Sequence, residues 1–331
     1  MWYNGAAGAA LLAPLETLYK AYVSRKRQRY LNGQQQSYRS PVPVVVVGNL
    51  VVGGAGKTPL VLAICDRLQQ AGMRPGILSR GYQARAEIFP RAVLPSDDAI
   101  EVGDEPLLMA QRSGAPVCID PQRARGARWL VEQAGCDIVL CDDGLQHYAL
   151  ARDVEVAVID AQRELGNGRC LPAGPLREPA ERLHDVDLVV YNGADNAKQN
   201  DAATFTMHLK PSLLVRLHDN QTTNVRELAE LASAGPVHAV TGIGNPQRFF
   251  ASLGELGFEI IEHSFGDHHP FSAADLQFDD ERTIIMTEKD AVKCRDFAPP
   301  QAWYLPVDAQ LEEGFYSALL GKIERSVEQL Q

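Results

Sequence analysis

The run Gly53-Gly54-Ala55-Gly56-Lys57-Thr58 has the composition of a loop that binds nucleotide phosphates. Glycines let backbone N–H groups turn inward around an anion, the lysine can reach the terminal phosphates, and the threonine can bind Mg²⁺. Before this loop, an apolar run predicts a buried strand over 42–48. After it, apolar residues recur at helical spacing and predict a helix over 57–71. The usual pattern has glycine where this chain has Val51, so the alternative is a glycine-rich turn with a chance Lys-Thr pair.

Two carboxylates, Asp142 and Asp143, follow a second apolar run that predicts a strand over 137–141. Such a strand places a carboxylate beside the phosphate loop, where it can hold Mg²⁺ directly or through water. The alternative is a turn, since Asp-Asp-Gly is a common turn sequence. The presence of a phosphate loop favours the metal role.

Three further polar groups could take part in chemistry. Asp104 and Glu105 begin a predicted helix over 104–113, where an N-cap and a favourable helix dipole are the default interpretations. Arg177 lies in a long irregular loop over 166–179 and could bind phosphate through two N–H groups, although a local pair with Glu178 is the alternative. His268, between Asp267 and His269, could act as an acid or base, bind a metal or cap a turn.

These groups lie on elements that alternate between strand and helix, which predicts a mainly parallel sheet covered on both faces. Ligands bind at the carboxyl ends of such strands. A second α/β pattern begins near residue 205 and ends in an amphipathic helix over 309–328. The other predicted strands are 75–79, 117–120, 154–160, 186–191, 237–240, 258–261 and 283–286, and the other predicted helices are 122–134 and 179–184.

The composition limits the classes of partner and the cellular environment that fit this chain. A net charge of −10 argues against broad nucleic-acid binding, and six cysteines without C-x-x-C spacing are typical of buried thiols in a reducing cytoplasm. Residues 1–31 combine an apolar stretch with a basic end, but Pro14 and Glu16 interrupt the stretch, which is too short to span a bilayer. This segment is either an interfacial helix on a membrane or a helix packed on the protein.

Together these residues resemble the tetraacyldisaccharide 4′-kinases of lipid A biosynthesis. The matching stretches run in the family's order from residue 47 to 290 and include the loop with Val51, so that valine is no departure. They are Val47-Gly48-Asn49, Gly53 to Pro59, Ser79-Arg80-Gly81-Tyr82, Gly103-Asp104-Glu105-Pro106, Asp142 to His147, Leu171 to Pro179, Asp267-His268, and Thr287 with Lys289-Asp290.

The resemblance implies an ATP- and Mg²⁺-dependent kinase that phosphorylates the 4′-hydroxyl of a lipid-linked glucosamine disaccharide 1-phosphate to give lipid IVA. It implies a P-loop kinase-like α/β/α sandwich with a smaller second α/β domain and an N-terminal amphipathic helix. The expected boundaries are 1–31, 32–205 and 206–331. We expect a monomer without nucleic-acid partners, bound peripherally through its N-terminal segment to the cytoplasmic face of the bacterial inner membrane.

The resemblance also implies a role for each site residue. Asp104 is the base and His268 pairs with it, while Lys57 and the rest of the loop from Gly53 to Thr58 bind ATP. The implied metal site and its acidic surroundings consist of Thr58, Asp142, Asp143, Glu178 and Glu105. The implied substrate or nucleotide contacts are Tyr82, Arg123 and Arg177, with Glu105 also assigned to the substrate.

Two other classes share a phosphate loop of this kind. Membrane-associated regulatory ATPases carry Lys-Gly-Gly-x-Gly-Lys-Thr and use the first lysine across a dimer, whereas this chain has Val52 there. GTP-driven metallochaperones need a guanine motif, which Lys289-Asp290 does not match, and clustered metal ligands, which the scattered cysteines do not supply.

Overall fold

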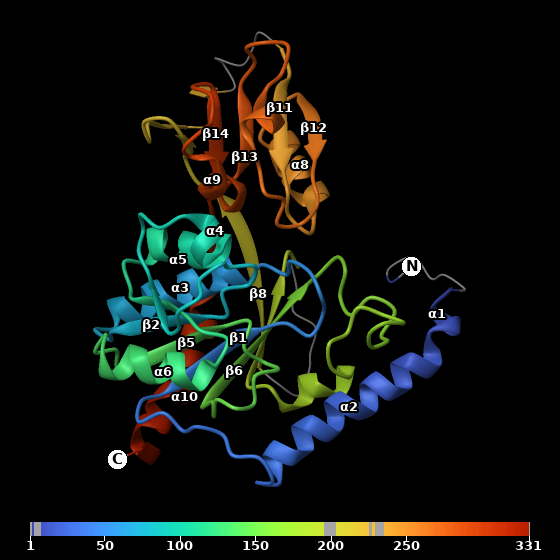
Figure 1. Cartoon of the computed structure of the whole chain (residues 1–331), viewed down its shortest axis with the longest axis vertical. Helices are drawn as coiled ribbons and strands as arrows, with labels where there is room; N and C mark the ends of the chain where they lie inside the picture. The colour runs from blue at the N-terminus through green and yellow to red at the C-terminus, as the bar shows by residue number, and fades with distance from the viewer. Residues whose placement is uncertain (1, 3–7, 195–202, 225–226, 229–234, 331) are drawn as a thin grey trace.

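The computed structural model describes residues 2, 8–194, 203–224, 227–228 and 235–330. These residues form two domains, one above the other in Figure 1, each built on its own sheet with helices packed against it. The two domains meet at Asp104 and Glu105 of the first, which contact His268 and Lys289 of the second.

The sheet of the first domain contains nine strands within the described residues. From β8 to β4 every neighbouring pair is parallel, and the two outer strands pair antiparallel. The central strands are buried on both faces, which explains their unbroken apolar sequences. In spatial order the strands are β15 (Val307–Leu311), β8 (Ala203–Pro211), β7 (Leu188–Asn192), β6 (Val154–Asp160), β1 (Val44–Gly48), β5 (Ile138–Asp142), β2 (Pro75–Ser79), β4 (Val117–Ile119) and β3 (Arg91–Val93).

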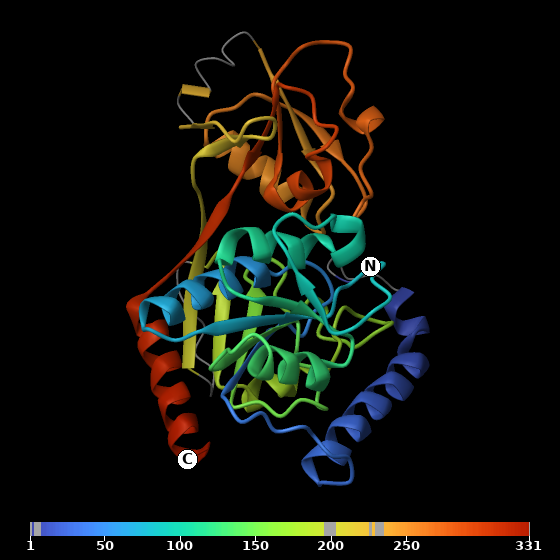
Figure 2. The ribbon, with the colours of Figure 1, turned by 60° about the vertical axis from the view of Figure 1, so that its left-hand side comes forward.

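Helices cover both faces of this sheet, as Figures 1 and 2 show. One face packs against α3 (Lys57–Gln70), α5 (Asp104–Ser113) and α10 (Glu313–Leu330), with the short α4 (Ala99–Val102) beside them. The other face packs against α6 (Arg123–Glu132) and the 3₁₀ helix η1 (Ala180–Asp185). The predicted α/β/α sandwich is therefore confirmed.

The second domain is a smaller α/β unit. Its parallel strands β11 to β14 are flanked by an antiparallel pair, with α8 packed on one face and α9 and η3 on the other. The elements are β9 (Leu214–Arg216), β10 (Thr222–Thr223), β11 (Val237–Thr241), α8 (Pro246–Glu255), β12 (Ile260–Ser264), η3 (Ala273–Leu276), β13 (Ile284–Thr287), α9 (Glu288–Cys294) and β14 (Ala302–Leu305).

The end of the chain differs from the sequence expectation. We placed 206–331 in the second domain and a helix over 309–328, but β15 pairs with β8 in the first sheet and α10 begins only at Glu313. Phe315, Leu319 and Ile323 of α10 are fully buried in the first domain's core. The two domains are thus joined by the antiparallel pair β8–β15; the yellow β8 and the orange-red strand that leads into α10 both rise between the domains in Figure 2. A helical period cannot show which of two sheets a helix covers.

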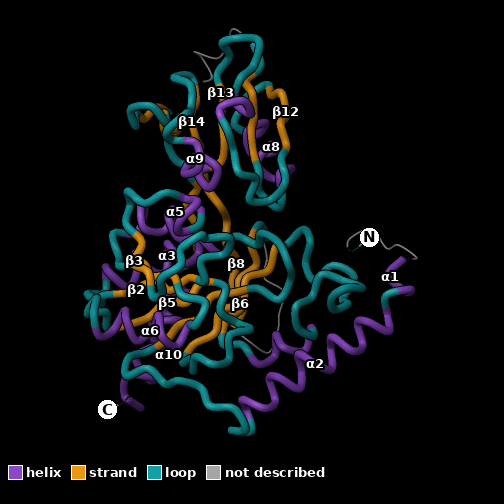
Figure 3. Tube along the Cα trace, in the orientation of Figure 1, coloured by secondary structure: helices purple, strands orange, loops and turns teal. Residues whose placement is uncertain are grey.

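The N-terminal segment forms α1 (Gly8–Leu11) and α2 (Ala13–Leu31), which lies along the lower edge of the first domain in Figure 3. The expected amphipathic helix is not confirmed, because the side facing the protein is polar: the Tyr19 hydroxyl donates to the Arg177 carbonyl at 2.9 Å, and Arg27 pairs with Asp185 at 3.0 Å. The outer side carries apolar residues, with Leu18 69 % exposed.

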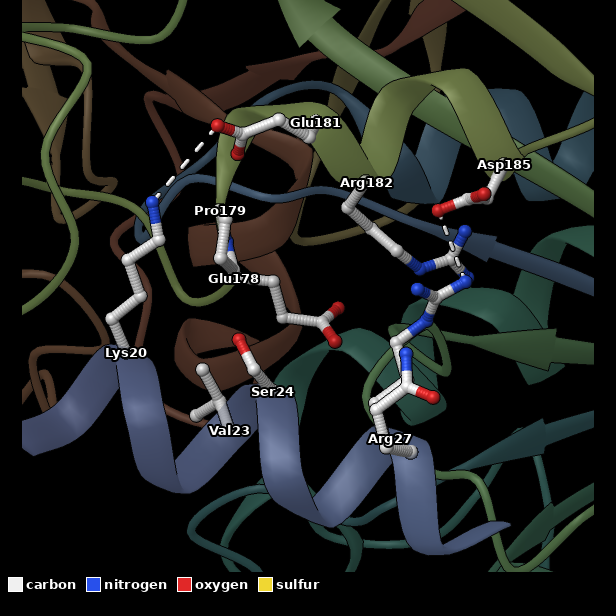
Figure 4. Close-up of a pocket in the computed structure, with 10 residues that line it drawn as sticks. Lys20, Val23, Ser24, Arg27, Glu178, Pro179, Glu181, Arg182 and Asp185 are labelled. Carbon is white, nitrogen blue, oxygen red and sulfur yellow. Dashed lines mark ion pairs between the residues drawn. The ribbon is translucent and has the colours of Figure 1, made fainter. Parts of the chain in front are cut away.

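Between α2 and η1 lies a cavity of about 260 Å³ with mixed charges on its walls (Figure 4). None of the described helices has both the length and the apolar composition needed to cross a membrane.

Candidate active site between the two domains

The phosphate loop connects β1 to α3, as the sequence predicted. Gly56 has φ 91°, so the chain turns in a conformation that favours glycine before α3 begins at Lys57. A Cβ at Gly56 would lie only 2.3 Å from the amide nitrogen of Asn192, which in turn donates to the Ala55 carbonyl at 3.0 Å. The loop is therefore fixed by a side chain from the end of β7 as well as by its own glycines.

Lys57 points back over this loop. Its Nζ donates to Oδ1 of Asn49 at 3.1 Å and lies 3.6 Å from Oδ1 of Asp143. Asn49 also donates to the carbonyls of Val51 and Gly53 at 2.6 and 3.2 Å, which holds the loop open in front of the lysine. The Lys57 side chain is 12 % exposed, and its ammonium group lies at the start of a helix, where anions bind readily.

The two adjacent aspartates have opposite environments. Asp142 ends β5, is 1 % exposed and leaves Oδ1 without a hydrogen-bond partner. Burial, with Glu105 nearby, raises its pKa to about 7. Asp143 is also partly buried, but Lys57 and Arg177 outweigh that effect and lower its pKa to about 2; Arg177 Nη1 donates to both Asp143 oxygens at 2.9 and 2.8 Å.

Glu178 lies beside this pair and is held by other residues. Its carboxylate accepts hydrogen bonds from the Tyr148 hydroxyl and, at 3.0 Å, from the Gln146 amide. It is 3 % exposed and also lines the cavity against α2.

Asp104 meets His268 across the domain boundary. Nδ1 of His268 lies 2.9 Å from Oδ2 and 3.2 Å from Oδ1 of Asp104, and the Glu105 N–H donates to Oδ1 at 2.8 Å. Burial opposes ionisation of Asp104, but the hydrogen bond from His268 and the charges of Lys289 and Lys293 lower its pKa. An ionised carboxylate only accepts, so Nδ1 of His268 is the donor.

The second domain presents His268 from a sharply turned loop. His268 has φ 57°, and its backbone N–H donates to the Gly242 carbonyl at 3.0 Å. Gly242 is held by Asp290, which accepts from its N–H at 2.9 Å and from the Thr241 hydroxyl at 3.0 Å. Thr287 caps α9 by accepting a hydrogen bond from the Asp290 N–H, and the buried Asp290 carboxylate fixes the loop that supports His268.

The other three residues predicted to contact substrate or nucleotide differ in exposure and in contacts. Tyr82 is 56 % exposed, with its ring centroid 5.2 Å from that of His268. Glu105 pairs with Lys289 of the second domain at 2.8 Å. Arg123 is 3 % exposed and donates to the Asp142 carbonyl at 2.9 Å, so its observed contact is with the strand end beneath the site.

Comparison with known proteins agrees with this arrangement. The family model described as tetraacyldisaccharide-1-P 4′-kinase matches residues 8–324. The chain belongs to this family. It is therefore an ATP-dependent phosphotransferase with an alcohol acceptor, and the regulatory ATPase alternative is not favoured.

Individual relatives cover nearly the whole chain. Tetraacyldisaccharide 4′-kinases of Pseudomonas paraeruginosa and Pseudomonas fluorescens are 50 % and 52 % identical, over 98 % and 93 % of this chain and 96 % and 90 % of their own. The crystal structure of LpxK from Aquifex aeolicus in complex with ATP has a TM-score of 0.80 and 28 % identity, and the match covers 95 % of this chain and 99 % of that one.

Several residues of this kinase site were missed from the sequence. Asn192 ends β7 and could have been found by the strand-end rule that singled out Asp142. Arg248 of α8 donates to Asn192 at 2.7 Å and lies 3.6 Å from Asp160, and Arg163 donates to the Gly244 carbonyl at 2.9 Å. Through these contacts the second domain packs beside the phosphate loop. No local sequence pattern predicts them.

The donor set of the kinase fits Mg²⁺ at Asp142. Mg²⁺ is held in such sites by one or two carboxylates together with substrate phosphates and waters. The partnerless Oδ1 of Asp142 suits this role, and Thr58 stands at the second position of α3. Asp143 and Glu178 instead have their oxygens engaged by Arg177 and by Tyr148 with Gln146. Among the described residues, no three His, Cys, Asp or Glu side chains form a ready-made metal cluster.

Proposed function

We propose that Asp104 accepts the proton of the sugar hydroxyl when this enzyme transfers the γ-phosphoryl group of ATP to the 4′-position of a tetraacyl glucosamine disaccharide 1-phosphate. The observation that carries the assignment is the hydrogen bond between Asp104 and His268, which joins two domains beside a phosphate loop. Phosphoryl transfer needs positioning, charge stabilisation and an acceptor for the hydroxyl proton. The site offers each of these on a separate element.

The phosphate loop binds the ATP phosphates through backbone N–H groups, and Lys57 neutralises charge on the terminal phosphates. Mg²⁺ bound at Thr58 and Asp142 would neutralise phosphate charge further. Arg177, held in place by Asp143, presents a planar guanidinium at the rim of the same site. Tyr82, exposed beside His268, is placed to contact the sugar.

His268 orients the Asp104 carboxylate rather than accepting the proton itself, since its Nδ1 donates to that carboxylate. The burial of Asp104 restricts water at the base, which protects ATP from hydrolysis. Both members of the pair come from one chain, so a monomer is sufficient for activity.

The N-terminal helix supports attachment to a membrane surface. Leu15, Leu18 and Tyr22 point outward along α2, and Arg25 and Arg29 near its end are exposed. Apolar side chains can enter the interfacial region while cations meet anionic headgroups. We therefore place the enzyme peripherally on the cytoplasmic face of the inner membrane, where a lipid-linked substrate is within reach.

Transfer of label from γ-³²P-ATP to the disaccharide lipid 1-phosphate tests this assignment directly. Wild-type protein should label the acceptor in an Mg²⁺-dependent reaction, and Asp104→Asn should lose roughly 10²–10⁴-fold in turnover while still binding ATP. Undiminished transfer by Asp104→Asn would remove Asp104 from the role of base.

A further inference from the structure

Lys289 of α9, in the second domain, contacts two carboxylates of the first domain. Its Nζ donates to Oε1 of Glu105 at 2.8 Å and lies 4.0 Å from Oδ2 of Asp104. The same atom lies 3.3 Å from Nε2 of His268, on the side of the ring away from Asp104. The side chain is only 18 % exposed, and no role follows for it from the phosphate-binding or base chemistry described above.

His268 is therefore held between two opposite charges. Asp104 of α5 faces its Nδ1, and Lys289 of α9 faces its Nε2. The other neighbours are Asp267 on its own loop, with Oδ1 3.9 Å from Nε2, and the Tyr82 ring. Lys293, also on α9, lies 3.9 Å from Asp104 but pairs with Asp290.

We propose that Lys289 is a positioning residue for the Asp104–His268 pair: its ammonium, anchored on Glu105, donates to Nε2 of His268 and keeps the ring in the neutral form that carries its proton on Nδ1. The inference deepens the proposed role of the pair and rests on it.

The argument follows from donor and acceptor capacity. A lysine ammonium has three N–H donors and no acceptor, so it can hydrogen-bond Nε2 only when that nitrogen carries a lone pair. An imidazolium would instead direct an N–H at the ammonium, placing two positive groups 3.3 Å apart. Asp104 alone would favour the imidazolium as an ion pair, and Lys289 opposes it together with burial of the ring.

The charges around the ring act in opposite directions. The hydrogen bond to Asp104 raises the pKa of His268 on balance, and burial and Lys289 oppose that rise. Burial also disfavours the Lys289 ammonium, but Glu105 and Asp104 outweigh that effect and raise the pKa of Lys289 well above its usual value. Lys289 thus stays charged over the working pH range. A neutral ring leaves Asp104 without a full positive charge at its hydrogen-bonded oxygen, which preserves its capacity to accept a proton.

The ring itself can be observed by ¹⁵N NMR. Protein labelled at histidine is measured with Mg²⁺ and a non-hydrolysable ATP analogue, and the His268 signals are assigned by their loss in His268→Gln. We expect wild-type His268 to carry its proton on Nδ1, with a hydrogen-bonded but unprotonated Nε2, whereas free imidazole side chains favour the proton on Nε2. A wild-type ring protonated on Nε2 in its neutral form overturns the proposal without any variant.

Lys289→Met removes the donor and its charge. The imidazolium form of His268 should then persist to higher pH, and the acid limb of the kcat profile should move in the same direction. We expect kcat to fall about 10-fold to 100-fold, as for partners that orient metal-bound histidines, with little change in KM for ATP. Lys289→Arg, which keeps the charge and N–H donors, should restore part of the loss.

Lys293→Gln is the matched control, because it removes a positive charge on the same helix at a similar distance from Asp104, while its amide N–H can still donate to Asp290. The control should leave the tautomer of His268 unchanged. Unchanged His268 signals and an unchanged pH profile in Lys289→Met would reject the proposal, as would equal NMR shifts in both variants. The NMR readouts do not require turnover, so they remain distinct from failure of Asp104 as the base.

Discussion

Nδ1 of His268 lies 2.9 Å from Oδ2 of Asp104, although 164 positions separate the two residues in the chain. If Asp104 served only as a helix terminus, asparagine would replace it with little loss, because Asn and Asp cap helices equally well. As the proton acceptor, Asp104→Asn should instead lower kcat by roughly 10²–10⁴-fold.

Residues that act as one unit have non-additive effects. His268→Ala should also lower kcat, and the double variant should be little worse than Asp104→Asn alone. The measurement is acceptor labelling under saturating ATP, with ATP affinity measured separately for each variant. Multiplicative losses in the double variant would show that the two side chains act independently.

Lys57→Ala removes the cation that faces the terminal phosphates from the start of α3. We expect turnover to fall by about 10²-fold or more while the protein remains folded, because this charge stabilises the transferring group. Thermal unfolding checks the fold, and Arg67→Ala, on the outer side of the same helix, is the control for loss of a positive charge. Normal kinase activity in Lys57→Ala would contradict the nucleotide site.

Leu15 and Leu18 test the membrane role of α2 better than deletion of residues 1–31, because Tyr19 of the same helix supports the Arg177 loop. Replacing both leucines with Gln should weaken co-sedimentation with anionic vesicles by at least about 10-fold, since each buried leucine contributes roughly 1.5–3 kcal/mol. ATP binding should not change. Thr17→Gln, exposed on the same helix, is the control, and equal sedimentation of all three proteins would favour a helix that only packs on the protein.

Arg112 of α5 pairs across the domain boundary with Glu288 of α9 at 2.7 Å and within its own domain with Asp308 of β15 at 2.5 Å. Arg112→Ala should weaken the contact between the domains and lower kcat/KM by roughly 3-fold to 10-fold, in keeping with the modest energies of partly exposed ion pairs. Arg91→Ala breaks an exposed pair with Asp97 within the first domain and should leave kcat/KM unchanged. Equal kinetics for both variants would show that the Arg112 contact between the domains does not support activity.

His147 should make the fold sensitive to acid. Burial, with Arg123 and Arg80 nearby, lowers its pKa to about 4, whereas the unfolded chain has a pKa near 6.5. The unfolded state therefore takes up the proton first, so the stability present above about pH 6.5 is lost as pH falls toward 4, by at most roughly 3 kcal/mol. Urea unfolding should show a shallower pH dependence in His147→Gln, and parallel curves would contradict the prediction.

Much of the first domain could be predicted from periodicity alone. The apolar runs at β1, β5 and β6 are buried on both faces, so their sequence pattern carries the signal of a parallel sheet. The structure places Asp142 at the end of β5, where the sequence put it, because that position depends only on where the apolar run stops. Its role as a ligand for Mg²⁺ stays a prediction from the strand-end rule.

Residues that depend on distant contacts could not be assigned in this way. The local sequence around Asp104 indicates only that this residue begins a helix. Its contact with His268 of the second domain is what suggests a further function. Lys289 and Arg248 likewise lie on helices whose apolar spacing indicates which side packs on the second domain. That spacing does not indicate which residues of the first domain they contact. The strand β15 was mistaken for helix because its alternation is short and runs directly into α10.

The pair β8–β15 has a consequence for how the protein is made. Because Pro211 and Val307 are register partners, the whole second domain is inserted between two adjacent strands of the first. A ribosome therefore completes the second domain before it releases Phe315, Leu319 and Ile323, which fill the core beside β6 and β8. The domain translated first finishes folding last, so its apolar face under α10 remains exposed on the nascent chain until α10 has been synthesised.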